Sequence, residues 1–146
     1  MKKEWNEDTW ERSRWPNFSF AEMKCSHSGL CFMDESALDK LQEMRNQIGP
    51  LWVTSAYRDK AHPIEARKTD AAGNPRPGAH FTGKAFDISC SGEKALQVVA
   101  AALSVHFTGL GIKQHGAHAK RFIHIDMISE DDNFHVLRPT IWSYGS

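Results

Sequence analysis

The sequence has no net charge, no long apolar run and few cysteines, and each of these absences excludes a class of function. Eighteen Lys and Arg residues balance eighteen Asp and Glu residues, so no overall field favours a nucleic acid or a charged membrane. No apolar run reaches the roughly 18 residues that cross a bilayer. Three cysteines are too few for a disulfide scaffold. The remaining composition, 40% hydrophobic and 25% charged over 146 residues, predicts one soluble globular domain.

The N-terminal segment is polar and carries three tryptophans. Residues 1–17 begin with two lysines, but no apolar stretch follows them, so the segment lacks the pattern of a secretory signal. We therefore expect the protein to be made in the cytoplasm. Trp5, Trp10 and Trp15 indicate an arm that packs on the domain proper, which we place at residues 18–146.

Two stretches have the hydrophobic periodicity of helices. In the first, apolar side chains recur at helical spacing from Leu38 to Ile48. Asp34 is placed to cap its N-terminus, and Gly49 with the following proline ends it. The second stretch, residues 91–107, begins at a serine that suits an N-cap. The apolar face predicted for this second helix consists of Leu96, Val99, Ala102 and Leu103.

Four short runs have the composition of β-strands, and a long polar loop separates the first two. This loop, residues 59–78, is rich in glycine and proline, and loops of such length are usually functional or mobile. His62 and Glu65 in this loop could line a cleft, but we favour solvated side chains. Helices and strands alternate without a regular β-α-β repeat, which predicts an α+β fold with a small, mainly antiparallel sheet flanked by helices. The predicted strands span residues 51–55, 85–89, 109–112 and 122–127.

The alternation of side chains along two of these strands suggests a metal site. In the last strand His124 and Asp126 share one face, while Ile123 and Ile125 belong to the core. Asp87 occupies the equivalent open face of the second strand, and Gly83 lets the chain turn so that His80 folds back toward it. Two histidines and a carboxylate, with one position left for water, form the donor set of catalytic zinc. Zinc lowers the pKa of a bound water to roughly 7.

Spacing alone leaves other interpretations open. A histidine and an aspartate seven positions apart occur often by chance. His80 and Asp87 could therefore each be an ordinary surface residue that binds no metal. The shared strand faces and the glycine turn favour the metal. A second cluster, Cys25, His27 and Cys31, lacks the fourth ligand of a structural zinc site, so we expect idle thiols there.

Three segments, "TSAYR", "GAHFTGKAFDI" and "GLGI…RFIHIDM", resemble the zinc D-Ala-D-Ala carboxypeptidase family. That family also includes L-Ala-D-Glu endopeptidases and is structurally akin to the Hedgehog signalling domain. Its signature, S-x-H-x-x-G-x-A-x-D with a later strand histidine, is matched except that Gly78 replaces the serine. The resemblance runs from residue 18 to residue 144 and is closest to compact phage and prophage members. It implies a Hedgehog-like single domain with one zinc ion on His80, Asp87 and His124.

The same resemblance implies a substrate cleft around the S-x-Y-R segment. The arginine of this segment, here Arg58, lies at the cleft in the family, and a guanidinium suits a peptide carboxylate or a developing oxyanion. Ser55 and Tyr57 flank the cleft in relatives, although Tyr57 could equally belong to the core and Arg58 could be a surface residue. We expect Trp142 and Tyr144 to pack against the domain, with a stacking contact on the substrate as the less favoured alternative.

The general base of the predicted site has three candidates. Many relatives carry a carboxylate a few residues before the last ligand, but the corresponding stretch "KQHGAHAKRF" has none. We rank Asp126 first, His118 second and His115 third as proton carriers. Asp126 lies only two positions from His124, so it could instead orient that histidine.

The resemblance implies a zinc peptidase that cuts peptidoglycan stem peptides, acts as a monomer and binds no nucleic acid. The compact size and the missing signal fit a phage or prophage lytic enzyme that reaches the cell wall after release through a holin, or as part of a virion. The missing upstream carboxylate favours an alternative, a wall-binding module that keeps the metal but has lost catalysis.

Overall fold

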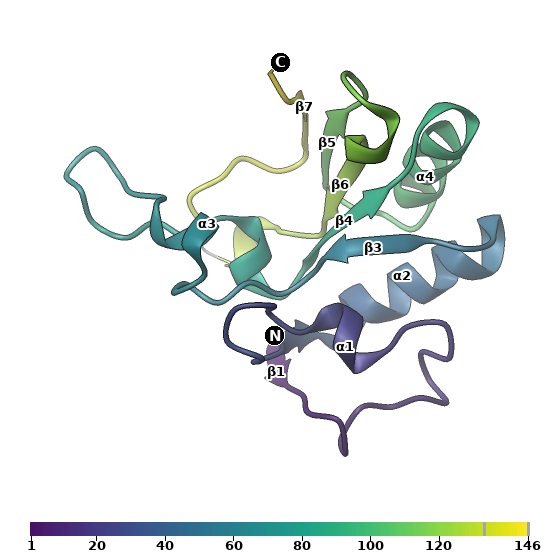
Figure 1. Cartoon of the computed structure of the whole chain (residues 1–146), viewed down its shortest axis with the longest axis horizontal. Coiled ribbons are helices and arrows are strands. Elements are labelled where there is room, and N and C mark those ends of the chain that lie inside the picture. Colours follow the sequence, from purple (N-terminus) through teal and green to yellow (C-terminus); the bar gives the residue numbers. More distant parts are fainter. Residues whose placement is uncertain (133, 146) are drawn as a thin grey trace.

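The architecture is α+β, as the sequence predicts, with two sheets and two long helices in one domain (Figure 1). The computed structural model describes residues 1–132 and 134–145. Among these residues no helix is both long and apolar enough to cross a bilayer. The elements are β1 (Lys2–Glu4), α1 (Phe20–Met23), β2 (Phe32–Asp34), α2 (Glu35–Ile48), β3 (Trp52–Ser55), α3 (Pro63–Ala66), η1 (Ala79–Thr82), β4 (Ala85–Ser89), α4 (Gly92–Ser104), β5 (Gly109–Lys113), η2 (His118–Lys120), β6 (Phe122–Asp126), η3 (Glu130–Asp132) and β7 (Thr140–Ser143).

The main sheet has the strand order β3-β4-β6-β5-β7 and is antiparallel except at one pair. All four strands predicted from the sequence are present, with shifts of one residue at some ends. The one parallel pair is β5 with β7. The sequence analysis did not predict strand β7. The register places Asp87 opposite His124 and Ala85 opposite Asp126.

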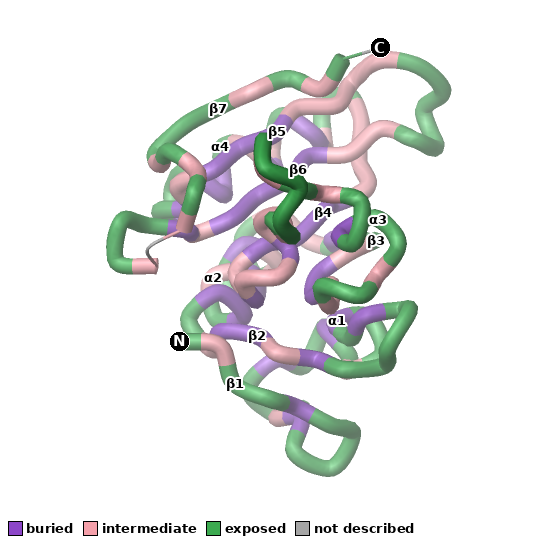
Figure 2. Tube along the Cα trace, turned by 90° about the vertical axis from the view of Figure 1, so that its left-hand side faces the viewer, coloured by how far each residue is buried: buried purple, intermediate pink, exposed green. Residues whose placement is uncertain are grey.

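Helices α2 and α4 cover one face of this sheet and leave the other for the site (Figures 1 and 2). The core face carries Phe86 and Ile88 from β4 with Ile123 and Ile125 from β6, all 1% exposed or less. These are the side chains whose alternation placed them in the core. Their neighbours along both strands therefore point to the opposite face, where Asp87 and His124 lie.

Helix α2 begins and ends where the sequence predicts, but the buried face of α4 was predicted incorrectly. The Asp34 side chain accepts a hydrogen bond from the Ala37 amide at 3.1 Å and so caps α2. In α4, Leu96 is 72% exposed and Leu103 is 56% exposed. Two adjacent faces of this apolar helix both show the i, i+3 and i+4 spacing. The face with smaller side chains is the buried one, because it lets α4 approach α2 and the sheet closely. The buried face of α4 consists of Ala95, Val98, Ala101 and Ala102.

The N-terminal segment packs against the domain through its tryptophans. The Trp5 ring makes edge contacts with Trp10 and Trp15 at centroid distances of 5.8 and 5.2 Å. Strand β1 pairs with β2, immediately before α2. The segment thereby covers the end of the domain beside η1, where the Asp34 backbone N–H donates a hydrogen bond to the Gly83 carbonyl oxygen at 2.9 Å.

The predicted loop of residues 59–78 contains one short helix, α3, that the sequence analysis did not predict. His62 caps this helix by accepting a hydrogen bond from the Ile64 amide at 3.1 Å. Pro63 occupies the first helical position, where its missing N–H costs nothing. The helix turns Glu65 inward, and that side chain is completely buried.

Candidate active site

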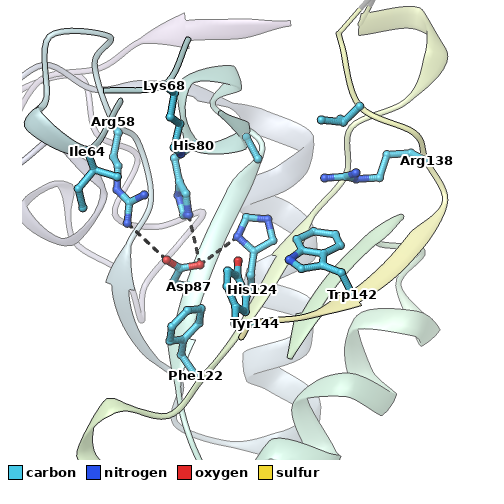
Figure 3. Close-up of a pocket in the computed structure, with 12 residues that line it drawn as sticks. Arg58, Ile64, Lys68, His80, Asp87, Phe122, His124, Arg138, Trp142 and Tyr144 are labelled. Carbon is cyan, nitrogen blue, oxygen red and sulfur yellow. Dashed lines mark hydrogen bonds and ion pairs between the residues drawn. The ribbon is translucent and has the colours of Figure 1, made fainter. Parts of the chain in front are cut away.

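The fold brings His80, Asp87 and His124 together on the open face of the sheet (Figure 3). Asp87 and His124 face each other across the β4–β6 pair, and His80 comes from η1 just before β4. Gly83 ends η1 with a φ of 75°, a left-handed conformation that glycine adopts freely. The Asp87 Oδ1 atom lies 2.9 Å from His124 Nδ1 and 3.2 Å from His80 Nε2.

Each histidine has its other ring nitrogen held by a partner. His80 Nδ1 lies 2.7 Å from the Ala56 carbonyl oxygen, and His124 Nε2 lies 2.9 Å from Asp126 Oδ2. If each of these nitrogens donates its proton, the lone pairs of His80 Nε2 and His124 Nδ1 point toward Asp87. Zinc bonds of about 2.0–2.1 Å in tetrahedral geometry put neighbouring donors roughly 3.3 Å apart. The donor set and its spacing therefore fit a zinc ion.

The electrostatics of the site keep the carboxylates ionised. Burial opposes the charge of Asp87, but the positive charge of His80 and the hydrogen bonds from both histidines outweigh burial and hold the pKa of Asp87 far below its ordinary value. For His124, burial again opposes the charge, and hydrogen bonds to Asp126 and Asp87 raise its pKa overall. Two histidines thus lie around one carboxylate oxygen, an arrangement that a divalent cation would satisfy without protons.

A cavity of about 520 Å³ opens above these three side chains. Its walls combine cationic groups with aromatic rings, and Asp87 is the single carboxylate among the described residues that line it. Cations on the walls and a metal on the floor would favour an anionic ligand. The lining residues are Arg58, Ile64, Lys68, Ala79, His80, Asp87, Phe122, His124, Val136, Arg138, Trp142 and Tyr144.

The buried Glu65 links two of the cations, Arg58 and Lys68, to the metal-site loop. Its Oε2 lies 3.4 Å from Arg58 and 2.9 Å from Lys68 Nζ, and its Oε1 accepts a hydrogen bond from the Gly78 amide at 2.7 Å. A guanidinium nitrogen of Arg58 lies 3.5 Å from Asp87 Oδ2. The expectation that Glu65 is solvated was therefore wrong, because the unpredicted helix α3 turns it inward.

Ser55 and Tyr57 lie away from the metal cavity. Tyr57 is 3% exposed and stacks between Phe32 and Phe81 at centroid distances of 5.6 and 6.3 Å. With Ser55 it lines a second hollow of about 270 Å³ on the other side of Arg58. A contact of Ser55 or Tyr57 with substrate stays a prediction, whereas Arg58 lines both hollows.

The three proposed proton carriers lie outside the set of described cavity-lining residues. Asp126 has an exposure of 0%, and its oxygens bind His124 and Arg138. Burial raises its pKa, but hydrogen bonds from Arg138 and His124 bring the pKa down to about 2. This geometry favours the orienting role of Asp126. His118 is exposed in η2 and His115 is half-buried, so their catalytic role stays a prediction.

The cysteine cluster shows no sign of a second metal site. Cys25 and Cys31 are buried free thiols, and His27 is exposed. His27 lies near His62 instead, with ring centroids 6.0 Å apart. Within residues 1–132 and 134–145, the one group of histidine, cysteine and carboxylate side chains arranged to hold a metal is His80, Asp87 and His124.

The comparison with known families agrees with this geometry. The family described as Peptidase M15 matches residues 16–126, about three quarters of the chain. The chain belongs to the Peptidase M15 family. This confirms the resemblance to zinc D-Ala-D-Ala carboxypeptidases and the predicted fold class. No curated protein and no solved structure gives a significant match.

Several lining residues of this M15 peptidase had no recognisable sequence signal. Lys68 lies in a polar loop, and Arg138, Trp142 and Tyr144 lie beyond the matched segment. The spacing of Glu65 and Lys68, three apart, was the one available hint, since such a pair meets on a helix. A substrate contact of Trp142 and Tyr144 was the less favoured alternative, and nothing local pointed to Arg138, because tertiary contacts alone bring it to the site.

Proposed function

We propose that this M15 peptidase is a zinc enzyme that hydrolyses peptide bonds in the stem peptides of bacterial peptidoglycan. The observation that carries the proposal is the convergence of His80 Nε2, Asp87 Oδ1 and His124 Nδ1 within 4.8 Å at the floor of a cavity. Each histidine is also oriented by its own partner, which is a common feature of metal sites. His80, Asp87 and His124 would hold the ion.

The chain's own residues supply the positioning and the electrostatics. Bound zinc would contribute Lewis-acid activation of the peptide carbonyl and of water. Arg58, 17% exposed and held by Glu65, points a guanidinium into the cavity beside Asp87. There it can donate hydrogen bonds to a substrate carbonyl or carboxylate and stabilise negative charge that develops on the carbonyl oxygen. The wall of Phe122, Trp142 and Tyr144 excludes water from one side.

The charges of the cavity support stem peptides as the substrate class. Arg138 is engaged by Asp126, whereas Arg58 and Lys68 share the single buried carboxylate of Glu65 and keep hydrogen-bond donors for a ligand. Stem peptides carry free carboxylates close to their D-Ala-D-Ala and L-Ala-D-Glu bonds, so both a carboxypeptidase and an endopeptidase could use these cations. The phage or prophage origin, the delivery by a holin or virion and the monomeric state belong to the same proposal.

A wall-binding module that keeps the metal is the second candidate. It is favoured by one observation: apart from Asp87, the described lining residues include no carboxylate that could carry a proton. Such a module would bind stem peptides through the same cations and the same metal. It differs from the enzyme only in leaving the peptide bonds intact.

Purified protein tests both candidates through metal analysis and digestion of peptidoglycan. The wild-type protein is expected to take up about one equivalent of zinc and to release new amino groups from purified peptidoglycan. Mass spectrometry of the products identifies the bond that is cut. His124→Ala is expected to abolish zinc binding and cleavage, whereas His135→Ala, a change of an exposed histidine, leaves both intact.

Each alternative predicts a different result. Less than about half an equivalent of zinc after loading contradicts every metal-dependent function of the chain. Stoichiometric zinc with tight binding to cell walls and unchanged muropeptides supports the binding module instead.

A further inference from the structure

We infer that Arg138 is a positioning residue of the metal centre, which it controls through Asp126 and His124. The inference rests on the proposed zinc site. It adds to that site a residue from the segment beyond the family match, which ends at Asp126. The C-terminal segment thereby becomes part of the metal centre.

The contacts form a continuous chain from the C-terminal segment to the imidazole ring of His124. Arg138 Nε donates to Asp126 Oδ1 at 2.8 Å, and its terminal nitrogen donates to Oδ2 at 2.7 Å. The same Oδ2 lies 2.9 Å from His124 Nε2. A bidentate guanidinium–carboxylate pair has a fixed plane, so the plane of Asp126 is set by Arg138. Asp126 in turn sets the ring orientation of His124.

Burial restricts the geometry of the Arg138–Asp126 ion pair. The Arg138 side chain is 6% exposed and that of Asp126 is 0% exposed. The other terminal nitrogen of Arg138 donates to the Leu137 carbonyl oxygen at 2.7 Å, and the Trp142 ring lies 4.9 Å from the guanidinium carbon. Hydrogen bonds engage all three guanidinium nitrogens, and the Trp142 ring packs near the group, so the guanidinium has little freedom to move away from Asp126.

Two glycines of β5 provide the space in which the C-terminal segment reaches the site. A Cβ at Gly109, opposite Asp126 in the sheet, would lie 2.5 Å from Asp126 Oδ1 and would overlap Nε of Arg138. A Cβ at Gly111, opposite His124, would lie 2.7 Å from the Trp142 indole. The sequence "GLG" thus leaves two gaps over the sheet face, and Arg138 fills the first.

The contacts of Arg138 determine which nitrogen of His124 carries the proton. With Arg138 on both oxygens of Asp126, one remaining lone pair of Oδ2 faces His124 Nε2. The imidazole is then held with its proton on Nε2 and its lone pair on Nδ1, toward Asp87 and His80. Without the guanidinium, the Asp126 carboxylate would keep only the long 3.3 Å hydrogen bond from the Ile128 amide besides His124, and the ring of His124 would be held less firmly.

Zinc affinity of an Arg138→Gln variant tests the inference without relying on activity. Competition with a chromophoric chelator is expected to show about 10- to 100-fold weaker zinc binding, the usual effect of losing an orienting partner. The visible spectrum of the cobalt-substituted protein is expected to change as His124 shifts. Arg138→Lys restores part of the affinity because it keeps the charge. Arg76→Gln, a change of an exposed arginine, serves as the control and leaves the affinity unchanged.

A measurement on the wild-type protein covers the case in which these variants fail to fold. In the nitrogen–proton spectrum of the zinc-loaded protein, His124 is expected to show a slowly exchanging proton on Nε2, with the metal on Nδ1. Metal on Nε2 would overturn the inference, and so would a folded Arg138→Gln variant with wild-type affinity and an unchanged cobalt spectrum. In both cases the zinc site survives, whereas a wild-type protein that binds no zinc overturns the site and the inference together.

Discussion

Asp87 and His124 lie directly opposite each other on β4 and β6, with 2.9 Å between the carboxylate Oδ1 and the imidazole Nδ1. The two strands are central in the sheet, so their relative position is held by hydrogen bonds on both sides. The helix-covered face beneath them is fully packed. Two of the three proposed metal-binding side chains therefore project from the centre of the sheet, whereas His80 comes from η1 and the cavity walls come from loops and from the C-terminal segment.

Substitution of His118 tests whether this residue carries a proton in catalysis. If His118 carried the proton, His118→Ala would lower kcat by about 10²- to 10⁴-fold. The structure places this side chain in the exposed η2, and it is absent from the described lining of the cavity. We therefore expect kcat for muropeptide hydrolysis to stay within about twofold of the wild-type value. A loss of a hundredfold or more with intact zinc content would show that η2 moves into the cavity.

Lys68 is expected to recognise a carboxylate of the substrate. Its Nζ lies at the cavity wall, held by Glu65. Lys68→Met keeps the aliphatic stem but removes a charged hydrogen bond, and such bonds contribute about 1.5–3 kcal/mol. For a muropeptide with free carboxylates we expect KM to rise about tenfold or more, with a small change in kcat. The matched control is Arg67→Met, which removes an exposed cation next to Lys68.

An amidated muropeptide shows whether Lys68 contacts the substrate or only Glu65. If Lys68 acts through a substrate carboxylate, the variant and the wild type should bind an amidated muropeptide equally well. An equal loss for the free and the amidated substrates would mean that Lys68 acts only by holding Glu65.

The buried Glu65 makes stability dependent on pH. Burial opposes its charge, but hydrogen bonds from Lys68 and from the Gly78 amide, with the charge of Arg58, hold its pKa below the ordinary value. A carboxyl with a lowered pKa in the folded state stabilises the protein above its unfolded-state pKa, and this stability disappears as the pH falls through the folded-state pKa. We expect Glu65→Gln to cost about 1.5–3 kcal/mol near neutral pH, the contribution of a charge-assisted hydrogen bond.

Urea unfolding of the zinc-free proteins at several pH values measures this effect. The difference between wild type and Glu65→Gln should be largest near pH 7 and should shrink below about pH 4. A difference that is the same at both ends of this range would show that the carboxylate charge of Glu65 does not stabilise the fold.

Two glycines with similar backbone angles should respond differently to the same substitution. Gly83 and Gly116 have φ values of 75° and 77°, so alanine strains the backbone at either position by roughly 1–2 kcal/mol. At Gly116 a Cβ meets no atom within 4 Å, whereas at Gly83 it overlaps the Phe32 carbonyl and lies 2.9 Å from Lys2 Cβ. We expect the midpoint of thermal unfolding to fall clearly further for Gly83→Ala.

Gly83→Ala should also weaken zinc binding, because Gly83 ends η1 and so determines where His80 lies. Chelator competition on both variants checks this. Equal unfolding midpoints and equal zinc affinities would show that contact with β2 is unimportant for the position of η1.

The local pattern of the chain determined much of this site. Alternation along residues 85–89 and 122–126 placed Asp87 and His124 on the face opposite the core, because a strand repeats every two residues whatever surrounds it. Asp34 and Gly49 marked the ends of α2 for equally local reasons, since caps satisfy backbone groups within one turn. The family signature around His80 rests on the same kind of short-range spacing.

Tertiary structure decided the rest, because those features depend on contacts between residues far apart in the chain. Helix α4 offers two apolar registers, and only its approach to α2 and the sheet selects the one with Val98 rather than Leu96. Arg138 reaches Asp126 only because β7 pairs with β5 and Gly109 leaves a gap. No local periodicity encodes such a meeting, so the sequence predicted the proposed metal-binding residues while the fold determined what orients and surrounds them.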